Sequence, residues 1–238
     1  MSAKQRVDAQ PAFLLHSRPY SETSLVLDVF SRDYGRVALL ARGARRPRSA
    51  LRGVLIGFQG LELGWFGGGE VKTLARAEWQ GGQPLLAGRG LLLGYYLNEL
   101  LVRLLPREDG HPLLFDAYAS ALAALAGGAG DAPELRRFEQ ILLREIGYGL
   151  SLAHDAEGAA VDGQLRYRYL VERGPIPVRG DEGMPSLSGK TLLDMAADDY
   201  RDPCTQAESK GLMRQLLAHY LNGKPLQSRR VFMELQEF

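Results

Sequence analysis

The sequence predicts an α+β protein in which a small β-barrel precedes a helical domain. Two observations lead to this prediction. Residues 1–84 contain short runs rich in Val, Leu and Phe that are separated by turn residues, a pattern typical of strands. After Gly81-Gly82-Gln83-Pro84 the periodicity becomes that of long apolar helices. We therefore place the domain boundary there, with residues 1–84 in the first domain and 85–238 in the second.

The first domain contains five predicted strands, at residues 13–16, 24–30, 36–41, 59–66 and 70–78. Arg18-Pro19-Tyr20 and Asp33-Tyr34-Gly35 mark turns, and Gly67-Gly68-Gly69 joins the last two strands as a hairpin. Five short strands with a loop between the third and fourth favour a five-stranded OB-fold barrel. An SH3-like barrel has much the same pattern, and periodicity does not separate the two.

The second domain reads as a set of helices, at residues 91–105, 112–126, 133–146, 191–197, 205–221 and 228–238. Residues 151–189 interrupt them with a segment rich in Gly, Pro and Asp that contains one predicted strand at 165–170. We therefore predict an all-α helical domain with an irregular insertion at 151–189. A segment of this kind inside a compact protein usually has a function or is a degenerate subdomain.

Charge is distributed unevenly along the chain. Residues 1–84 hold 12 Lys and Arg against 7 Asp and Glu, a net charge of +5, whereas residues 85–238 hold 17 against 21, a net charge of −4, which gives +1 for the whole chain. Six arginines and no acidic residue lie between Tyr34 and Leu61. Arginine matches phosphate geometry with a planar fork of N–H donors, so this arrangement predicts a polyanion partner for the first domain. The residues that we expect to contact phosphate are Arg42, Arg45, Arg46, Arg48 and Arg52, assisted by Arg36, Lys72 and Arg76 on neighbouring strands.

Several classes of protein are excluded or disfavoured. No apolar run approaches the roughly 20 residues of a membrane span, and the first dozen residues lack the apolar core of a signal peptide. A single cysteine, Cys204, rules out an internal disulfide framework and suits a reducing cytosol. We therefore expect a cytoplasmic protein.

The chain also lacks the usual patterns of metal and nucleotide chemistry. Its four histidines are far apart and one cysteine assembles no zinc site, so we expect no metal and no cofactor. Gly189-Lys190-Thr191 resembles the end of a phosphate-binding P-loop, but the first glycine is displaced by one residue and no apolar strand precedes it. We therefore disfavour the hypothesis that the protein is an ATPase.

Longer segments resemble a known family. The front half contains HSRPYSETS and GARRPRS, and the back half contains NELL, LRRFEQILLREIGYG and GKPLQSRR. From about Ala12 to Phe232 the chain resembles the RecO family of bacterial recombination mediators. That resemblance implies an N-terminal OB-fold, a C-terminal helical domain and, in some members, a zinc-binding insertion. Here Ala153-His154-Asp155 and Val178-Arg179-Gly180 replace the cysteine pairs. We therefore expect a degenerate zinc-finger-like segment without zinc, held by packing alone.

The resemblance also implies activities and partners. RecO-like proteins bind single- and double-stranded DNA, anneal complementary strands and engage the acidic tail of the single-stranded-DNA-binding protein SSB; with RecR they help to load RecA. They are not enzymes. For the SSB tail we expect Arg136 and Arg137 on the helix at 133–146, with Lys224, Arg229 and Arg230 as a second basic cluster. The alternative is an OB-fold RNA-binding or translation module with a helical dimerisation domain.

Overall fold

The computed structural model describes residues 6–128, 131–178 and 185–236. The chain divides into two compact units. The first takes in residues 1–129 and 226–238, and the second takes in residues 130–225. The helices that follow the barrel begin after Pro84 and belong to the same unit as the barrel. A domain boundary at residue 84 stays a prediction.

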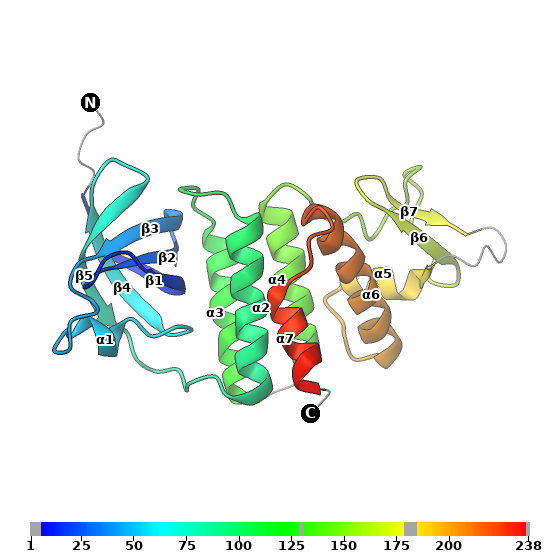
Figure 1. The fold of residues 1–238 in the computed structure, drawn as a ribbon. Helices are drawn as coiled ribbons and strands as arrows, with labels where there is room; N and C mark the ends of the chain where they lie inside the picture. The colour runs from blue at the N-terminus through cyan, green and yellow to red at the C-terminus, as the bar shows by residue number, and fades with distance from the viewer. Residues whose placement is uncertain (1–5, 129–130, 179–184, 237–238) are drawn as a thin grey trace. The chain divides into compact units, whose positions relative to one another are not determined.

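The first unit contains a five-stranded β-barrel (Figure 1). Its strands are β1 (Arg6–Pro19), β2 (Leu25–Ser31), β3 (Gly35–Ala41), β4 (Gly60–Phe66) and β5 (Val71–Trp79). They close in the order β1-β2-β3-β5-β4, and every pair is antiparallel except the parallel pair of β3 with β5. The prediction of five strands in this half is confirmed. Strand β1 is longer than predicted because it begins at Arg6 and pairs with β4 before it pairs with β2.

Irregular pairing lets β1 serve two neighbours. Its register shifts between Val7 and Gln10 opposite β4, and again between Leu14 and His16 opposite β2. Such β-bulges bend a strand and increase its twist, which a small barrel needs in order to close. The interior is filled by alternate side chains of the strands, among them Leu27, Val29, Leu39, Leu63 and Trp65.

Two long helices pack against the barrel within the first unit, α2 (Gly88–Leu104) and α3 (Pro112–Gly127). Phe13 and Phe30 of the barrel meet Phe115 and Tyr118 of α3 at ring-centroid distances of 5.1 to 6.1 Å. Buried Asn98 of α2 donates to the Leu15 carbonyl at 2.9 Å and accepts from the Tyr118 hydroxyl. Apolar contacts and one buried polar network therefore join these helices to β1.

The C-terminal helix α7 (Gln227–Gln236) is attached to α2 by one carboxylate. Glu99 accepts from the backbone N–H groups of Gln227 and Ser228, both at 2.9 Å, and from the Ser228 hydroxyl at 2.7 Å. Burial alone would raise the pKa of Glu99, but the bonds from Ser228 and Gln227 outweigh it and lower the pKa below its ordinary value. A carboxylate at a helix N-terminus satisfies N–H groups that have no partner inside the helix.

Replacing Glu99 by Gln should therefore loosen α7, because the neutral amide binds these donors less well. The expected cost is about 1 kcal/mol, the usual value of a helix cap. Because the pKa of Glu99 is lowered in the folded state, its contribution is present above the unfolded pKa and is lost as the pH falls below that value. Amide exchange of residues 227–236 measures the effect. Equal protection of α7 in wild type and variant, at neutral pH, would contradict this account.

The second unit contains α4 (Asp131–Glu145), a small sheet, α5 (Gly189–Ala196) and α6 (Pro203–Tyr220). The back half is mostly helical, as predicted, but the prediction that it is all-α is wrong. A three-stranded sheet occupies part of the segment at 151–189, with β7 (Gly174–Pro177) and β8 (Leu187–Ser188) on either side of β6 (Arg166–Leu170). Only β6 was predicted, since β8 has two residues and β7 contains Pro175 and Pro177, which a sheet tolerates on an edge strand.

Packing alone does not hold the inserted segment. The hydroxyl oxygens of two buried tyrosines of β6 accept backbone N–H groups of the preceding loop, Tyr169 from Ser151 at 3.1 Å and Tyr167 from Asp162 at 2.8 Å. Gly189 approaches the Asp162 carbonyl so closely that a Cβ would lie 1.9 Å from its oxygen. These contacts order the segment through hydrogen bonds as well as through its core.

Candidate nucleic-acid interface

The segment from Arg42 to Arg52, which we call the arginine loop, follows β3 and ends in the first residues of the single-turn helix α1 (Leu51–Val54). Backbone hydrogen bonds shape it as successive turns, from Arg46 N to Gly43 O at 3.1 Å and from Ser49 N to Arg46 O at 3.0 Å. Gly43 has a φ of +69°, and the buried side chain of Ala44 anchors the loop to the barrel core. The loop is therefore a defined surface rather than a free chain.

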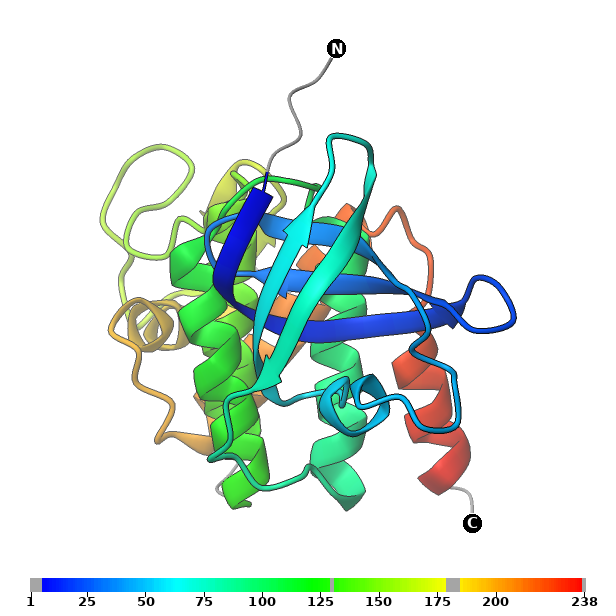
Figure 2. The same ribbon diagram turned by 90° about the vertical axis from the view of Figure 1, so that its left-hand side faces the viewer.

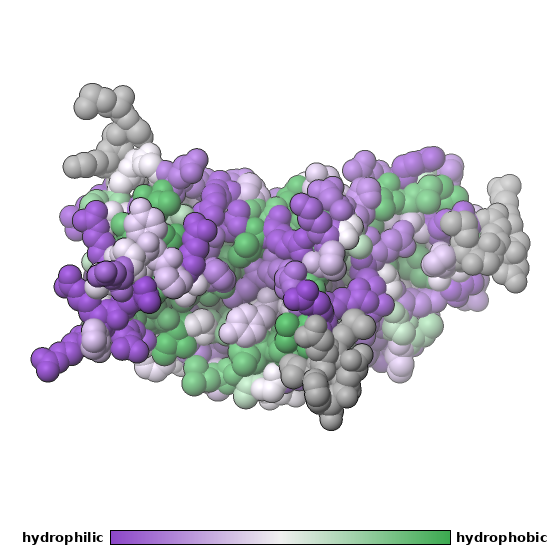
Figure 3. Space-filling model, viewed as in Figure 1, coloured by the Kyte–Doolittle hydropathy of each residue, from purple (hydrophilic) through white to green (hydrophobic). Residues whose placement is uncertain are grey.

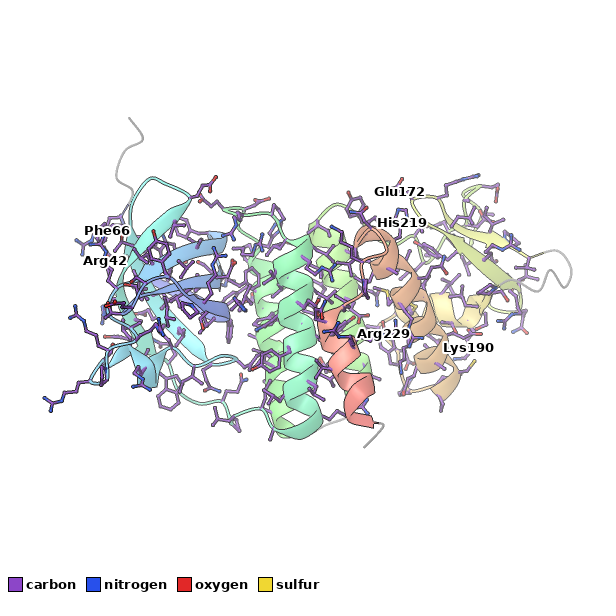
Figure 4. The ribbon with its side chains drawn as sticks, viewed as in Figure 1. Arg42, Phe66, Glu172, Lys190, His219 and Arg229 are labelled. Atoms are coloured by element: carbon purple, nitrogen blue, oxygen red, sulfur yellow. The ribbon has the colours of Figure 1, made fainter. Side chains whose placement is uncertain are left out.

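Four guanidinium groups of this loop face solvent. Arg42, Arg46, Arg48 and Arg52 are exposed, and within the described residues none of them makes a hydrogen bond or ion pair through its side chain. Figure 3 shows hydrophilic side chains gathered over the barrel beside α1, and Figure 4 labels Arg42 there. Unpaired arginines held on one ordered loop repel each other unless an anion lies between them.

Arg45 differs from its neighbours because it is engaged with the protein. Its guanidinium donates to the Ser21 carbonyl at 2.8 Å, and its backbone N–H donates to the Thr23 carbonyl at 2.9 Å. Both acceptors lie in the turn between β1 and β2, so Arg45 fixes the arginine loop to that turn. Figure 2 shows this face of the barrel.

Arg36 and Lys72, which were predicted to contact phosphate, bind groups of the protein instead. The Arg36 guanidinium donates to the Val102 carbonyl at the end of α2, and burial lowers its pKa. Lys72 is buried, forms an ion pair with Glu108 and donates to the Gly69 carbonyl at 3.1 Å. Val102 and Glu108 are distant in sequence from Arg36 and Lys72, so the local charge pattern could not identify them as partners. Both side chains are therefore poor candidates for a phosphate contact.

Arg76 on β5 is exposed but paired. Its guanidinium lies 2.6 Å from a carboxylate oxygen of Glu78, and this carboxylate raises the pKa of Arg76, with smaller contributions from Glu62 and Asp8. Carboxylates surround it, so its surroundings attract phosphate less than the arginine loop does.

The aromatic residues of the barrel separate into core and surface. Trp65 and Phe58 are buried, and Tyr34 packs edge-on against Trp65 with a ring-centroid distance of 5.4 Å. Tyr20, in the turn to which Arg45 binds, is 69% exposed, and Phe66 is 42% exposed. The sequence could not make this separation, because barrel interiors also contain aromatic side chains.

In the second unit, the two arginines predicted for a peptide tail are occupied. Arg136 is 8% exposed and donates at 2.6 Å to Glu139, which is fully buried. Arg137 is half-exposed and pairs with Glu134 and Asp198, and the Asp198 carboxylate raises its pKa. The spacing of three residues between Arg136 and Glu139 was a local signal of this pairing.

The second predicted basic cluster is divided between the two units. Lys224 belongs to the second unit, whereas Arg229 and Arg230 belong to α7 in the first. All three side chains are exposed. Arg229, labelled in Figure 4, makes no hydrogen bond or ion pair among the described residues.

The second unit also contains a pocket that the sequence did not indicate. It measures about 210 Å³ and lies beyond the end of α4, where Tyr148 and Tyr220 stack at a centroid distance of 4.1 Å. Leu150 and Leu216 add apolar surface, and Glu172 and Arg173 contribute charge. Within the described part of the chain the Arg173 side chain has no hydrogen-bond or ion-pair partner. The lining residues come from three segments that are far apart in sequence, at 147–151, 169–174 and 216–220.

A carboxylate binds the start of α5, where Gly189-Lys190-Thr191 resembles the end of a P-loop. Glu208 accepts from the Ser188 N–H at 2.8 Å and from the Thr191 hydroxyl at 2.6 Å, at the start of α5. Lys190 binds Asp194 and Asp202. A phosphate at this helix end would have to displace Glu208, which weighs against nucleotide binding there.

In the described residues, no group of three or more His, Cys, Asp or Glu side chains is placed to hold a metal ion. The helices searched in the same residues include none long and apolar enough to cross a bilayer.

Comparisons with known proteins cover nearly the whole chain. The family model "Recombination protein O N terminal" matches residues 6–82, and "Recombination protein O C terminal" matches residues 87–230. The DNA repair protein RecO of Aromatoleum aromaticum is 62% identical, and those of an Azoarcus species and Dechloromonas aromatica are 58% and 56% identical. Each alignment covers 100% of both sequences.

Proposed function

Because the chain belongs to the RecO family, whose members are non-enzymatic proteins of DNA repair and recombination, we propose that it binds DNA through the arginine loop and anneals complementary strands. The observation that supports this most strongly is the set of four exposed, unpaired arginines on one ordered loop. We further propose that the barrel is an OB-fold, since its strand order and its parallel β3·β5 pair close a five-stranded barrel.

The proposed mechanism needs no covalent chemistry. Base pairing drives annealing, and the protein lowers the repulsion between phosphates and raises the local concentration of strands. Phosphate contacts carry no sequence information, so both single- and double-stranded DNA should bind. We propose a bacterial cytoplasmic setting, with RecR and the SSB-coated strand as partners in loading RecA.

A strand-annealing assay tests this function. Two complementary oligonucleotides, one with a donor dye and one with an acceptor dye, should pair faster when the protein is present, with or without SSB on the strands. An RNA-binding or translation module should show no preference for SSB-coated DNA. Annealing no faster than in buffer would contradict the proposal.

We propose that the pocket beside Tyr148 in the second unit binds the SSB tail, an acidic peptide that ends in an apolar residue. Such a tail needs an apolar pocket with a fixed cation on its rim. The pocket supplies Leu150, Leu216 and two tyrosine rings, and Arg173 is an unpaired cation on its lining. Arg136 is buried against Glu139, which makes it a poor candidate for this contact.

Replacing Arg173 by Ala should weaken binding of an SSB-tail peptide about tenfold, because one charge-assisted contact is lost. Fluorescence anisotropy of a labelled peptide measures it. Arg137→Ala is the matched control, since Arg137 already binds Glu134 and Asp198. Loss of peptide affinity in the control with none in Arg173→Ala would place the tail on α4 instead.

A further inference from the structure

We propose that Tyr20 stacks on an unpaired base of the strand whose phosphates the arginine loop binds, so that the site discriminates single-stranded from duplex DNA. This inference rests on the proposed function of the arginine loop. It adds a contact of a different kind, because a tyrosine ring binds the face of a base and contributes no charge.

The position of Tyr20 is the first observation. It lies in the turn between β1 and β2, and its backbone N–H donates to the Ser24 carbonyl at 3.1 Å, which closes the turn. Its side chain is 69% exposed. Among the large hydrophobic side chains of the described residues, this is the highest exposure, and Leu85 shares it. A single exposed aromatic ring is ordinary on a protein surface. Exposure alone therefore assigns nothing to Tyr20.

The second observation is that this turn and the arginine loop are bound together. Arg45 donates from its guanidinium to Ser21 and from its backbone to Thr23, one residue and three residues after Tyr20. The turn that carries Tyr20 and the loop that carries the free arginines thus lie together at one end of the barrel. On this account Arg45 is a positioning residue, which holds Tyr20 beside the cations rather than binding phosphate itself.

The third observation is the chemistry of that surface. A single strand presents phosphates and unstacked bases together, and proteins bind it with a cationic groove and aromatic rings. In a duplex the base faces are covered by their neighbours, so only the phosphates remain available to this site. Trp79 of β5 is 56% exposed and donates from its indole N–H to Gln59 at 3.1 Å. Phe66 is a further exposed aromatic of the barrel. It pairs with Arg6 at the start of β1, whereas Tyr20 follows the end of that strand, and no described contact joins Phe66 to the arginine loop.

Equilibrium binding of an oligo-dT strand and of a duplex of the same length, each over a range of salt concentrations, tests the proposal. Tyr20→Ala should lower single-strand affinity roughly 5- to 150-fold, the usual loss per stacked base. Tyr20→Phe should retain it, since the ring is kept. The slope of log affinity against log salt should not change in Tyr20→Ala, because stacking releases no counterions. Duplex affinity should also stay the same.

The outcomes separate failure of this inference from failure of the proposed function. Wild-type protein that binds neither DNA would contradict the proposed function itself. If wild type binds and Tyr20→Ala binds the single strand equally well, the stacking assignment is overturned and the arginine loop is not. Equal losses on single strand and duplex would also overturn it, because they would indicate disruption of the loop. A loss in Phe66→Ala with none in Tyr20→Ala would move the stacking contact to β4.

Discussion

Replacing Arg42, Arg46 and Arg48 together by Ala should lower the affinity for single-stranded DNA about a hundredfold at low salt. At about 1 kcal/mol for each exposed phosphate contact, three contacts correspond to roughly that factor. The fold should be unaffected, because within the described residues these side chains bind nothing in the protein. The loss should be nearly the same for different base sequences, since phosphates are identical along a strand. Fluorescence anisotropy with labelled oligonucleotides measures both effects.

A charge-matched variant controls for the loss of three positive charges. Arg144, Lys210 and Arg214 are exposed cations of the second unit without a side-chain partner among the described residues. Replacing all three by Ala changes the net charge by the same amount. This control should keep most of its DNA affinity. Equal losses in the two triple variants would mean that overall charge, and not the arginine loop, determines binding.

Replacing Arg136 by Ala should destabilise the second unit by about 3–5 kcal/mol, the usual cost of removing one partner of a buried ion pair. The substitution leaves Glu139, which has 0% exposure, without the guanidinium that neutralises it. Because domains are stable by only about 5–15 kcal/mol, much of the stability of this unit would be lost. Chemical denaturation followed by circular dichroism measures the change.

Two further variants separate the ion pair from its surroundings. Arg137→Ala should cost at most about 1 kcal/mol, since Arg137 is half-exposed and its partners are solvated. Replacing Arg136 and Glu139 together by Leu should recover most of the loss, because both buried charges are then removed together. An Arg136→Ala protein as stable as wild type would contradict the assignment of a structural role.

The sequence predicted the barrel better than it predicted the back half, for a physical reason. Strands β2 to β5 are short runs rich in apolar residues that are bounded by turn residues, and this local pattern matches the structure. In the sheet of the second unit, one edge strand contains two prolines and another strand has only two residues. Neither strand shows the alternation of apolar and polar residues by which a strand is recognised in a sequence. Hydrogen bonds from distant residues, such as Ser151 to Tyr169, complete it.

The same distinction applies to the candidate sites. The concentration of arginines at 42–52 was visible in the sequence because it is a local feature. The partners of Arg36 and Lys72 lie 66 and 36 residues away, so their orientation could not be predicted. The bond from Arg45 to Ser21 spans 24 residues, and the pocket beside Tyr148 combines three separate segments. Both depend on tertiary packing, which a pattern in one segment does not encode.

The salt dependence of single-strand binding tests the central claim most directly. Each phosphate contact on a single strand adds about 0.7 to the slope of log affinity against log salt. If Arg42, Arg46 and Arg48 each bind a phosphate, the triple Ala variant should show a slope smaller than that of wild type by about two. An unchanged slope in the triple variant would contradict the claim that the arginine loop binds DNA.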